Sequence, residues 1–470
     1  MTSPRSANFR SARGNYSPWY LSRPRLVVTC CLFATLYLYL HYYDGSTPTL
    51  IPEDSFELLK DESLTDIVNS TLGFEKILVL NLPFRTDRRD AMTLAAATSN
   101  MKLEFVDGVT GDSIRNSAYP PPEENIKLSA GIRGSWRTHM NALQRIVNQN
   151  LTTALIFEDD VDWDVRIRPN LQRFALASRF LSEHDNVRLT PAKYPIDYRP
   201  NPETADTTFH TLSDNGITEK LPSLPLSSVY KKPLRYHRQP PPPPPNTPTS
   251  PYGDPSQWDI LWIGHCGAGF PRYYEYSPEH GRPQVTAANV LLTHANDQSV
   301  PSGKWLKAHP FQGDLDPLAN AYPPHTRVYH RATGGELCTV GYAVSQRGAR
   351  RLLHQFGIKA WNGIFDSELG RWCAGQDPQT EAESSISKEN RQNSTPSTGK
   401  GGRHGTERVC LTSQPPIFAH HHPVDGESDI GGLGGGYANK YETKYLRYSV
   451  RMNLERIVQG VKDLVDQWPD

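Results

Sequence analysis

A short apolar segment that ends in a cluster of acids constrains the fold more than any other feature of this sequence. Thr153 to Phe157 is an apolar run of strand length, and residues 76–80 (KILVL) form a second one. Between them, residues 135–148 carry apolar side chains at helical spacing, with Ser135 as a candidate N-cap. Strand, helix and strand in succession predict an α/β fold built on a parallel sheet.

Five acids follow the second strand within seven residues: Glu158, Asp159, Asp160, Asp162 and Asp164. Ligands of open α/β sheets bind beyond the carboxyl ends of the strands, which is where these acids are expected. Side chains alternate along a strand, so Glu158 and Asp160 can face one side and bind a hard divalent cation. Such a cation can bridge a diphosphate and stabilise charge on a departing nucleotide.

Two other interpretations of the acids were weighed. A solvated acidic turn is the commoner explanation of an isolated Asp-x-Asp, but the preceding buried strand argues against it. A calcium loop would use Asp160, Asp162 and Asp164 as its first ligands. That loop is excluded because Val165 replaces the required glycine and Leu171 the closing glutamate.

An uncharged segment near the N-terminus predicts a membrane anchor. Residues 26–43 contain no charged side chain and approach the ~20 residues that span a bilayer. Arginines precede the segment and acids follow it, so the positive-inside rule places the N-terminus in the cytoplasm and the rest in a lumen. A cleaved signal peptide and a buried helix remain alternatives. The segment has tyrosines at its end and no small-residue cleavage site, which favours the anchor.

Composition shifts divide the remaining chain. We expect a cytoplasmic tail at 1–25, the anchor at 26–43, a stem at 44–73 and the folded domain at 74–430. Residues 182–256 include a polyproline run and 376–408 lack apolar residues, so both are predicted insertions. Residues 431–470 are predicted to form a glycine-rich linker and a C-terminal helix, on whose one face Val450, Leu454, Ile457, Val458, Val461 and Val465 would lie.

Four cysteines lie beyond the predicted anchor, in a compartment where disulfides form. They allow three connectivities. We favour Cys266 with Cys338 and Cys373 with Cys410, because each pair would restrain a long insertion. Zinc is the alternative, but no Cys-x-x-Cys spacing supports it.

Charge composition excludes one class of partner. Lys plus Arg and Asp plus Glu number 50 each, whereas nucleic-acid-binding domains usually carry a basic excess. We therefore expect no nucleic acid partner.

Several sequence blocks, in order, resemble glycosyltransferase family 25, which includes lipooligosaccharide and procollagen galactosyltransferases. The blocks are LVLNLPFRTDRR (78–89), VDG (106–108), Gly134-Ser135 with His139, LIFEDDV (155–161), WDILWIG (258–264), GYAVS (341–345) with Gly348-Ala349, and SDI (428–430). The resemblance implies a GT-A fold, a UDP-hexose donor, Mn²⁺ or Mg²⁺, and inversion at the anomeric carbon. The two insertions, Trp136-Arg137-Thr138 and the histidines at 420–422 depart from the family pattern and leave the acceptor open.

Candidate donor-binding residues follow from these blocks. Asn81, Arg85 and Arg89 lie at the end of the first strand, where guanidinium groups suit phosphate oxygens, although arginines that only aid solubility are equally expected. Asp107 before Gly108 is a candidate nucleoside contact or an ordinary turn. Glu158 and Asp159 complete the donor set.

A metal site and a catalytic base complete the predicted active site. Asp160 and Glu158 are the predicted metal ligands, joined by one of the histidines at 420–422, of which we name His420 and His422. Asp366, in the block IFDSEL, is the candidate base, and helix capping is its alternative role. His139 is not assigned to catalysis.

Two functions remain open from the sequence. The first is a hexosyltransferase of the Golgi or endoplasmic reticulum membrane that moves galactose or glucose to a glycan or glycoprotein. The second is a membrane-anchored carbohydrate-binding protein of the same fold without turnover. Fold and metal site alone do not identify the acceptor.

Overall fold

The computed structural model describes residues 62–183, 189, 197–200, 220–230, 250–269, 289–309, 312–332, 335–376, 408–423, 428–430 and 442–470. The predicted tail, the anchor at 26–43 and most of the stem lie outside these residues. Within the described part of the chain, no helix is both long and apolar enough to cross a membrane.

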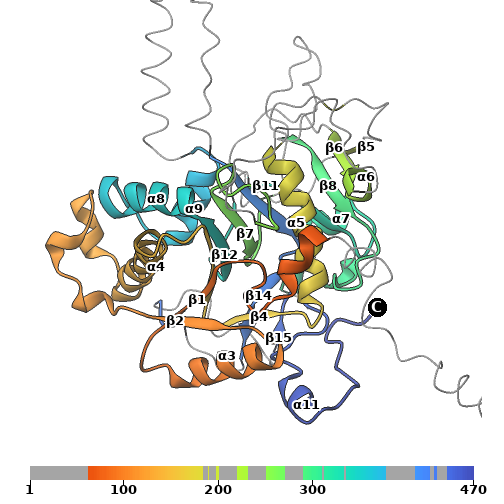
Figure 1. The fold of residues 1–470 in the computed structure, drawn as a ribbon, viewed down its shortest axis with the longest axis horizontal. Coiled ribbons are helices and arrows are strands. Elements are labelled where there is room, and N and C mark those ends of the chain that lie inside the picture. Colours follow the sequence, from red (N-terminus) through yellow and green to blue (C-terminus); the bar gives the residue numbers. More distant parts are fainter. Residues whose placement is uncertain are drawn as a thin grey trace, which may run out of the picture. The chain divides into compact units, whose positions relative to one another are not determined.

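A mixed sheet with the strand order β2-β1-β3-β12-β7-β13-β11-β8-β6-β5 forms the centre of the fold (Figure 1). β1, β2 and β3 are parallel, whereas β12 runs antiparallel to both β3 and β7. The predicted α/β class is therefore confirmed, but the sheet is mixed and not wholly parallel as predicted. The strands of this order are β1 (Lys76–Asn81), β2 (Leu103–Asp107), β3 (Thr153–Glu158), β5 (Asp197–Pro200), β6 (Lys220–Pro225), β7 (Ile260–Gly264), β8 (Leu291–His294), β11 (Arg327–Arg331), β12 (Gly341–Ser345) and β13 (Cys410–Gln414).

Shorter strands complete the edge that carries the acids. β4 (Val161–Trp163) pairs with β14 (Phe418–His422), which also pairs with β7 and with β15 (Glu442–Thr443). β9 (Lys307–His309) and β10 (Gln312–Leu315) form a separate two-stranded sheet.

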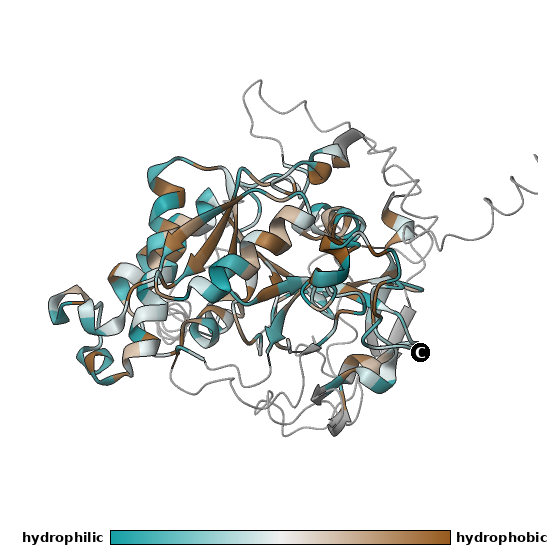
Figure 2. Cartoon of the chain, turned by 90° about the horizontal axis from the view of Figure 1, so that it is seen from below, coloured by the Kyte–Doolittle hydropathy of each residue, from teal (hydrophilic) through white to brown (hydrophobic). Residues whose placement is uncertain are grey.

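The side chains on both faces of the central strands are buried. Successive side chains of a strand point to opposite faces of the sheet, so each strand contributes to two hydrophobic clusters. In β1, Ile77 and Val79 enter one hydrophobic cluster, while Leu78 and Leu80 enter another. Figure 2 shows these central strands as hydrophobic. The near-continuous apolar runs in the sequence are explained by this burial on two sides.

Helices cover both faces (Figure 1). α4, α8 and α9 contribute to the cluster that contains Leu78, and α3 and α5 to the cluster that contains Ile77. The longer helices are α3 (Thr86–Thr98), α4 (Ala130–Asn148), α5 (Ile167–Glu183), α8 (Gln346–His354) and α9 (Phe365–Cys373); the shorter ones are η2 (Glu62–Val68), α6 (Ser227–Tyr230), α7 (Pro317–Ala321) and α11 (Leu454–Val458), with a π-helix at Gln355–Lys359.

The predicted start of the helix at residues 135–148 was wrong. α4 begins at Ala130, and Ser129 is its N-cap, whose hydroxyl accepts a hydrogen bond from the Ile132 amide. Ser135 lies inside the helix. The two glycines at 131 and 134 interrupt the apolar pattern of the first turn and hid it from sequence analysis.

The predicted insertions have different outcomes. Part of 182–256 belongs to the sheet, because β6 pairs with β8 and β5 pairs with β6. Most of the second segment, residues 377–407, lies outside the described residues. Both predicted disulfides are confirmed: Cys266–Cys338 and Cys373–Cys410.

The C-terminal helix is much shorter than predicted. α11 covers only Leu454–Val458, and Val458, Val461 and Val465 are at least 37% exposed. Polar contacts hold the tail instead: the side chain of Asn453 donates to the carbonyl of Val465 and accepts from its amide, at 3.0 and 2.7 Å.

Candidate active site

A pocket of about 320 Å³ opens beyond the carboxyl ends of β1, β2 and β3. The first turn of α4 and residues 428–430 close its other sides. The first turn of α4 and residues 428–430 lie close together, since a Cβ on Gly131 would lie 2.6 Å from the Asp429 carbonyl oxygen. Its polar and charged lining residues are Asn81, Arg88, Thr110, Asp112, Ser135, Thr138, His139, Glu158, Asp159, Asp160, Ser428 and Asp429.

Arg88 joins two of the acids at this pocket. Its Nη1 lies 2.7 Å from Asp159 Oδ1 and 2.8 Å from Asp160 Oδ2. All three side chains are at most 18% exposed. The sequence analysis named Arg85 and Arg89 and missed Arg88, which lies in the first turn of α3.

The charges of this cluster divide between the two carboxyls. Burial and neighbouring Asp160 raise the pKa of Asp159, although Arg88 opposes this. Burial alone would also raise the pKa of Asp160, but His420, Arg88 and Arg451 together hold it well below its usual range. Asp160 is therefore the more acidic member of the pair.

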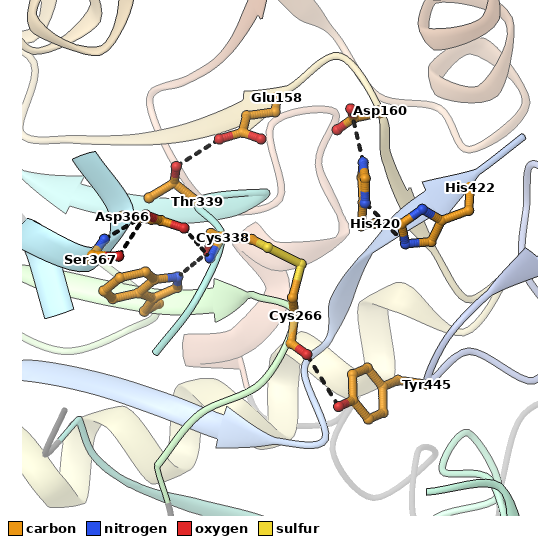
Figure 3. The surroundings of a disulfide bond; sticks show 11 residues. Glu158, Asp160, Cys266, Cys338, Thr339, Asp366, Ser367, His420, His422 and Tyr445 are labelled. Atoms are coloured by element: carbon orange, nitrogen blue, oxygen red, sulfur yellow. Dashed lines mark hydrogen bonds and ion pairs between the residues drawn. A yellow bond between two sulfur atoms is a disulfide. The ribbon is translucent and has the colours of Figure 1, made fainter. Parts of the chain in front are cut away.

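His420 contacts the same carboxylate from β14 (Figure 3). Its Nε2 lies 3.0 Å from Asp160 Oδ2, and its Nδ1 lies 3.1 Å from His422 Nε2. Burial lowers the pKa of His420, whereas the neighbouring Asp160 carboxylate raises it. The net shift of this pKa is upward. His421 instead contacts the Thr443 hydroxyl at 3.0 Å.

Glu158 points to another set of partners. Its Oε1 accepts a hydrogen bond from Thr339 Oγ1 at 2.6 Å and lies 3.5 Å from His139 Nε2. The ring of His139 also contacts the Tyr342 hydroxyl at 2.9 Å and stacks on Phe365. Glu158 lines the pocket, but its side-chain hydrogen bond goes to Thr339 and not to a partner of Asp160.

The predicted donor residues differ in position. Asn81 is 2% exposed, and its Nδ2 donates to Asp159 Oδ2 at 2.8 Å. Arg85 pairs with Asp87 and with Asp429, which lines the pocket. Arg89 stacks over Phe105, and Asp107 is 75% exposed, so neither side chain lines the pocket.

Asp366 lies in the first turn of α9, and the N-cap residue of this helix is Ile364. Its Oδ2 accepts from the Cys338 amide at 2.7 Å, and its Oδ1 accepts from the Ser367 amide at 2.5 Å (Figure 3). Asp366 is therefore not the cap of α9 and does not line the pocket. Cys338 links it to Thr339, the partner of Glu158.

The last two acids of the run are part of the scaffold. Asp162 is fully buried and accepts from the amides of Trp163 and Arg451 and from two hydroxyls, Thr443 and Ser449. Asp164 is also buried; it binds Arg166 through both oxygens and accepts from the Tyr448 amide. No local signal distinguishes these acids from Asp159 and Asp160.

A divalent cation fits the pocket at Asp160. Asp160 Oδ1 is buried and has no hydrogen-bond partner, and the imidazole of His420 lies beside the other oxygen. No group of three or more His, Cys, Asp or Glu side chains is arranged to hold a metal within the described residues. Mg²⁺-type sites commonly use one or two carboxylates together with substrate phosphates and water, so two protein ligands suffice.

The mixed α/β fold, with a pocket at the carboxyl edge of its central sheet, fits an α/β glycosyltransferase fold. Residues 74–227 match the model described as glycosyltransferase family 25 (LPS biosynthesis protein). The resemblance predicted from the sequence is thereby confirmed for these residues.

Individual relatives match over short regions. An inactive glycosyltransferase 25 family member 3 from Homo sapiens is 29% identical over 115 residues, 22% of this chain and 19% of the relative. Procollagen galactosyltransferase 2 from Mus musculus is 25% identical over 113 residues, again 22% of this chain and 18% of the relative. A glycosyltransferase 25 family member from Drosophila melanogaster is 22% identical over 36% of this chain and 32% of its own length. The matches thus cover a fifth to a third of these relatives.

Proposed function

We propose that the protein is a glycosyltransferase that moves a hexose, galactose or glucose, from a UDP-sugar to a hydroxyl of a glycan or glycoprotein. The proposal includes a GT-A type of fold and inversion at the anomeric carbon. It rests most heavily on one observation: Asp160, which lines the pocket beside Arg88 and contacts His420, has one buried oxygen without a hydrogen-bond partner.

Four charged or titratable side chains in or beside the pocket have a part in this proposal. Asp160 and His420 would hold Mn²⁺ or Mg²⁺, with His422 orienting His420 through its ring contact. The bound cation would stabilise negative charge on the departing nucleotide. Arg88 carries a delocalised charge suited to the diphosphate. Glu158, oriented by Thr339, offers a carboxylate to the hydroxyls of the sugar.

Inversion needs a base for the acceptor hydroxyl, and Asp366 remains the candidate. Each of its oxygens accepts one backbone amide, and a carboxylate oxygen has a second lone pair for another proton donor. The acceptor would therefore approach along Cys338 and Thr339, between Asp366 and the pocket. Asn81 supports Asp159, and Arg85 holds Asp429 at the pocket edge.

The proposed localisation is the membrane of the Golgi or endoplasmic reticulum, with residues 26–43 as a single anchor and the sheet domain in the lumen. The two confirmed disulfides support an oxidising compartment for this domain. A protease-protection assay on sealed microsomes tests the orientation. Digestion of the sheet domain without detergent would contradict it.

The test of the transferase proposal needs no acceptor. The full chain in detergent is incubated with a panel of UDP-sugars, with Mn²⁺ or with EDTA, and released UDP is measured. We expect slow hydrolysis of one UDP-hexose, lost in EDTA. A protein that binds UDP but releases none from any donor would instead be a binding protein without turnover; one human relative is named an inactive glycosyltransferase.

A further inference from the structure

A segment near the C-terminus, residues 443–453, donates hydrogen bonds to the backbone of the acid-bearing turn. We call this segment the C-terminal strap and residues 158–161 the acidic turn. The strap carries Arg451, whose sequence separation from Asp159 is 292 positions. The strap also lies beyond residues 74–227, where the family model matches.

Arg451 binds the backbone of the acidic turn. Its Nη2 donates to the Asp159 carbonyl oxygen at 2.7 Å, and its Nε donates to the Val161 carbonyl oxygen at 2.8 Å. The carbonyl between them, that of Asp160, accepts from the His421 amide at 2.9 Å. Three consecutive carbonyls are therefore held from the C-terminal side, which fixes the backbone from which Asp159 and Asp160 project.

The strap is itself fixed by the two scaffold acids. Ser449 and Thr443 donate to Asp162, and the Tyr448 amide donates to Asp164 at 3.1 Å. A backbone hydrogen bond from the Val450 amide to the Trp163 carbonyl oxygen, at 2.9 Å, adds to this pairing. The guanidinium of Arg451 is thus delivered to the acidic turn by a segment whose polar groups are buried and paired.

We propose that Arg451 is a positioning residue, which sets the affinity of the pocket for a divalent cation by holding the acidic turn. The proposal rests on the proposed function, because it takes Asp160 as the ligand of that cation. Arg451 does not line the pocket, and its side-chain hydrogen bonds go to the backbone of Asp159 and Val161. A planar guanidinium can bind two carbonyls at once, whereas the ammonium of lysine is a point donor on a flexible stem.

The test compares variants of the full chain in detergent. Arg451→Met removes both hydrogen bonds, and Arg451→Lys keeps the charge without the two-carbonyl geometry. Arg447→Met is the matched control: Arg447 lies on the same strap, but its contacts are with Asp466 and Asp470. The concentration of free Mn²⁺ is measured by electron paramagnetic resonance in the presence of UDP, and melting temperatures are measured in parallel.

Loss of a group that orients a metal ligand typically weakens metal binding by about 10–100-fold. We expect a Kd for Mn²⁺ raised by about that factor in Arg451→Met and by a smaller factor in Arg451→Lys. Arg447→Met should stay within about twofold of wild type even though it lowers stability. Wild-type Mn²⁺ affinity in a folded Arg451→Met protein would overturn the inference; should that variant not fold, unchanged affinity in Arg451→Lys would do so.

This outcome is separate from that of the proposed function. A wild-type protein that binds Mn²⁺ and UDP without releasing UDP from any donor would overturn the transferase proposal and still allow the Arg451 comparison. A wild-type protein that turns over a UDP-hexose, with affinities unchanged by either Arg451 variant, would overturn only the inference.

Discussion

The two pairs of aspartates in one acidic run serve different purposes. Asp159 and Asp160 line the pocket, share Arg88, and leave Asp160 Oδ1 without a partner. Asp162 and Asp164 lie two and four residues beyond Asp160, are fully buried, and have every oxygen hydrogen-bonded within the protein. The residue type is the same, so the difference lies in which elements reach each carboxylate.

This contrast teaches how a functional carboxylate is recognised. An acid whose lone pairs are already filled by amides and hydroxyls stabilises the fold but has little capacity left for a ligand. A buried acid with an unfilled oxygen at a pocket has kept that capacity. The pairs should therefore respond oppositely to substitution: one in stability, the other in ligand binding.

The largest expected effect is on stability, at Asp162. Asp162→Ala leaves buried donors of Thr443, Ser449 and Arg451 without their acceptor. Removing one partner of such a buried charged network costs about 3–5 kcal/mol in the free energy of unfolding. Chemical denaturation measures the change, with Asp112→Ala as a control because that side chain is 81% exposed. A loss at Asp162 no larger than at Asp112 would end the distinction between the pairs.

Asp160→Ala should show the reverse pattern. We expect metal-dependent UDP-sugar hydrolysis to fall by roughly 10²–10³-fold, as when one preorganised electrostatic group is lost. Removing Asp160 leaves Arg88 paired with Asp159 and ends the repulsion between the two carboxylates, so the stability should change less than in Asp162→Ala. Hydrolysis with unchanged Mn²⁺ dependence in this variant would place the cation elsewhere.

The histidines extend the comparison to pH. Burial lowers the pKa of His265 and of His330 to about 4, whereas a free histidine titrates near 6.5. The unfolded chain therefore binds more protons than the folded chain between these values. Their stabilising contribution is complete above about pH 6.5 and is lost as the pH falls through 4, up to about 3 kcal/mol each.

Urea unfolding between pH 7 and 4 measures this loss. A variant with His265→Gln and His330→Gln should show a flatter dependence than the wild type. An equally steep dependence in that variant would show that other groups govern acid unfolding. His420 contrasts with both, since Asp160 raises its pKa.

The smallest expected stability effect is at Asp366. Asp366→Asn can accept only one of the two amides, so one of the Cys338 and Ser367 N–H groups loses its partner. The expected cost is about 1–3 kcal/mol. Ser367→Ala is the control, because it removes only a 3.2 Å hydroxyl contact to the same carboxylate. Equal stability of Asp366→Asn and wild type would contradict the hydrogen bonding described above.

If Asp366 is the base, the same variant should also lose transfer by roughly 10²–10⁴-fold with UDP affinity retained. Transfer to an acceptor, normalised to the folded fraction, separates this effect from the loss of stability. Normal transfer would remove Asp366 from catalysis.

Sequence analysis found the parts of the fold that depend on local pattern. The strands at 76–81 and 153–158 are buried on both faces, so their apolar runs are clear in the sequence. The strands β5, β6 and β8 were missed, because their sequences resemble loops and only their pairing makes them strands. Helix α4 was started too late because glycines occupy its first turn, where the chain approaches Asp429 closely.

The site was predicted only in outline. The acid-bearing turn and the region of the histidines were named, but the choice of Arg88 over Arg85 and Arg89 depends on the rotation of α3. The division of the acids depends on the C-terminal strap, which is remote in sequence. Arg451 has no motif, and only the folded chain brings it to Asp159.

The central claim is that a divalent cation binds the unfilled oxygen of Asp160 and not the scaffold acids. Crystals grown with Mn²⁺ and UDP, measured for the anomalous scattering of manganese, test it directly. We predict one anomalous peak at bonding distance, about 2.0–2.6 Å, from Asp160 Oδ1, with His420 adjacent. A peak at Asp162 or Asp164, or bound UDP with no manganese near Asp160, would contradict the account.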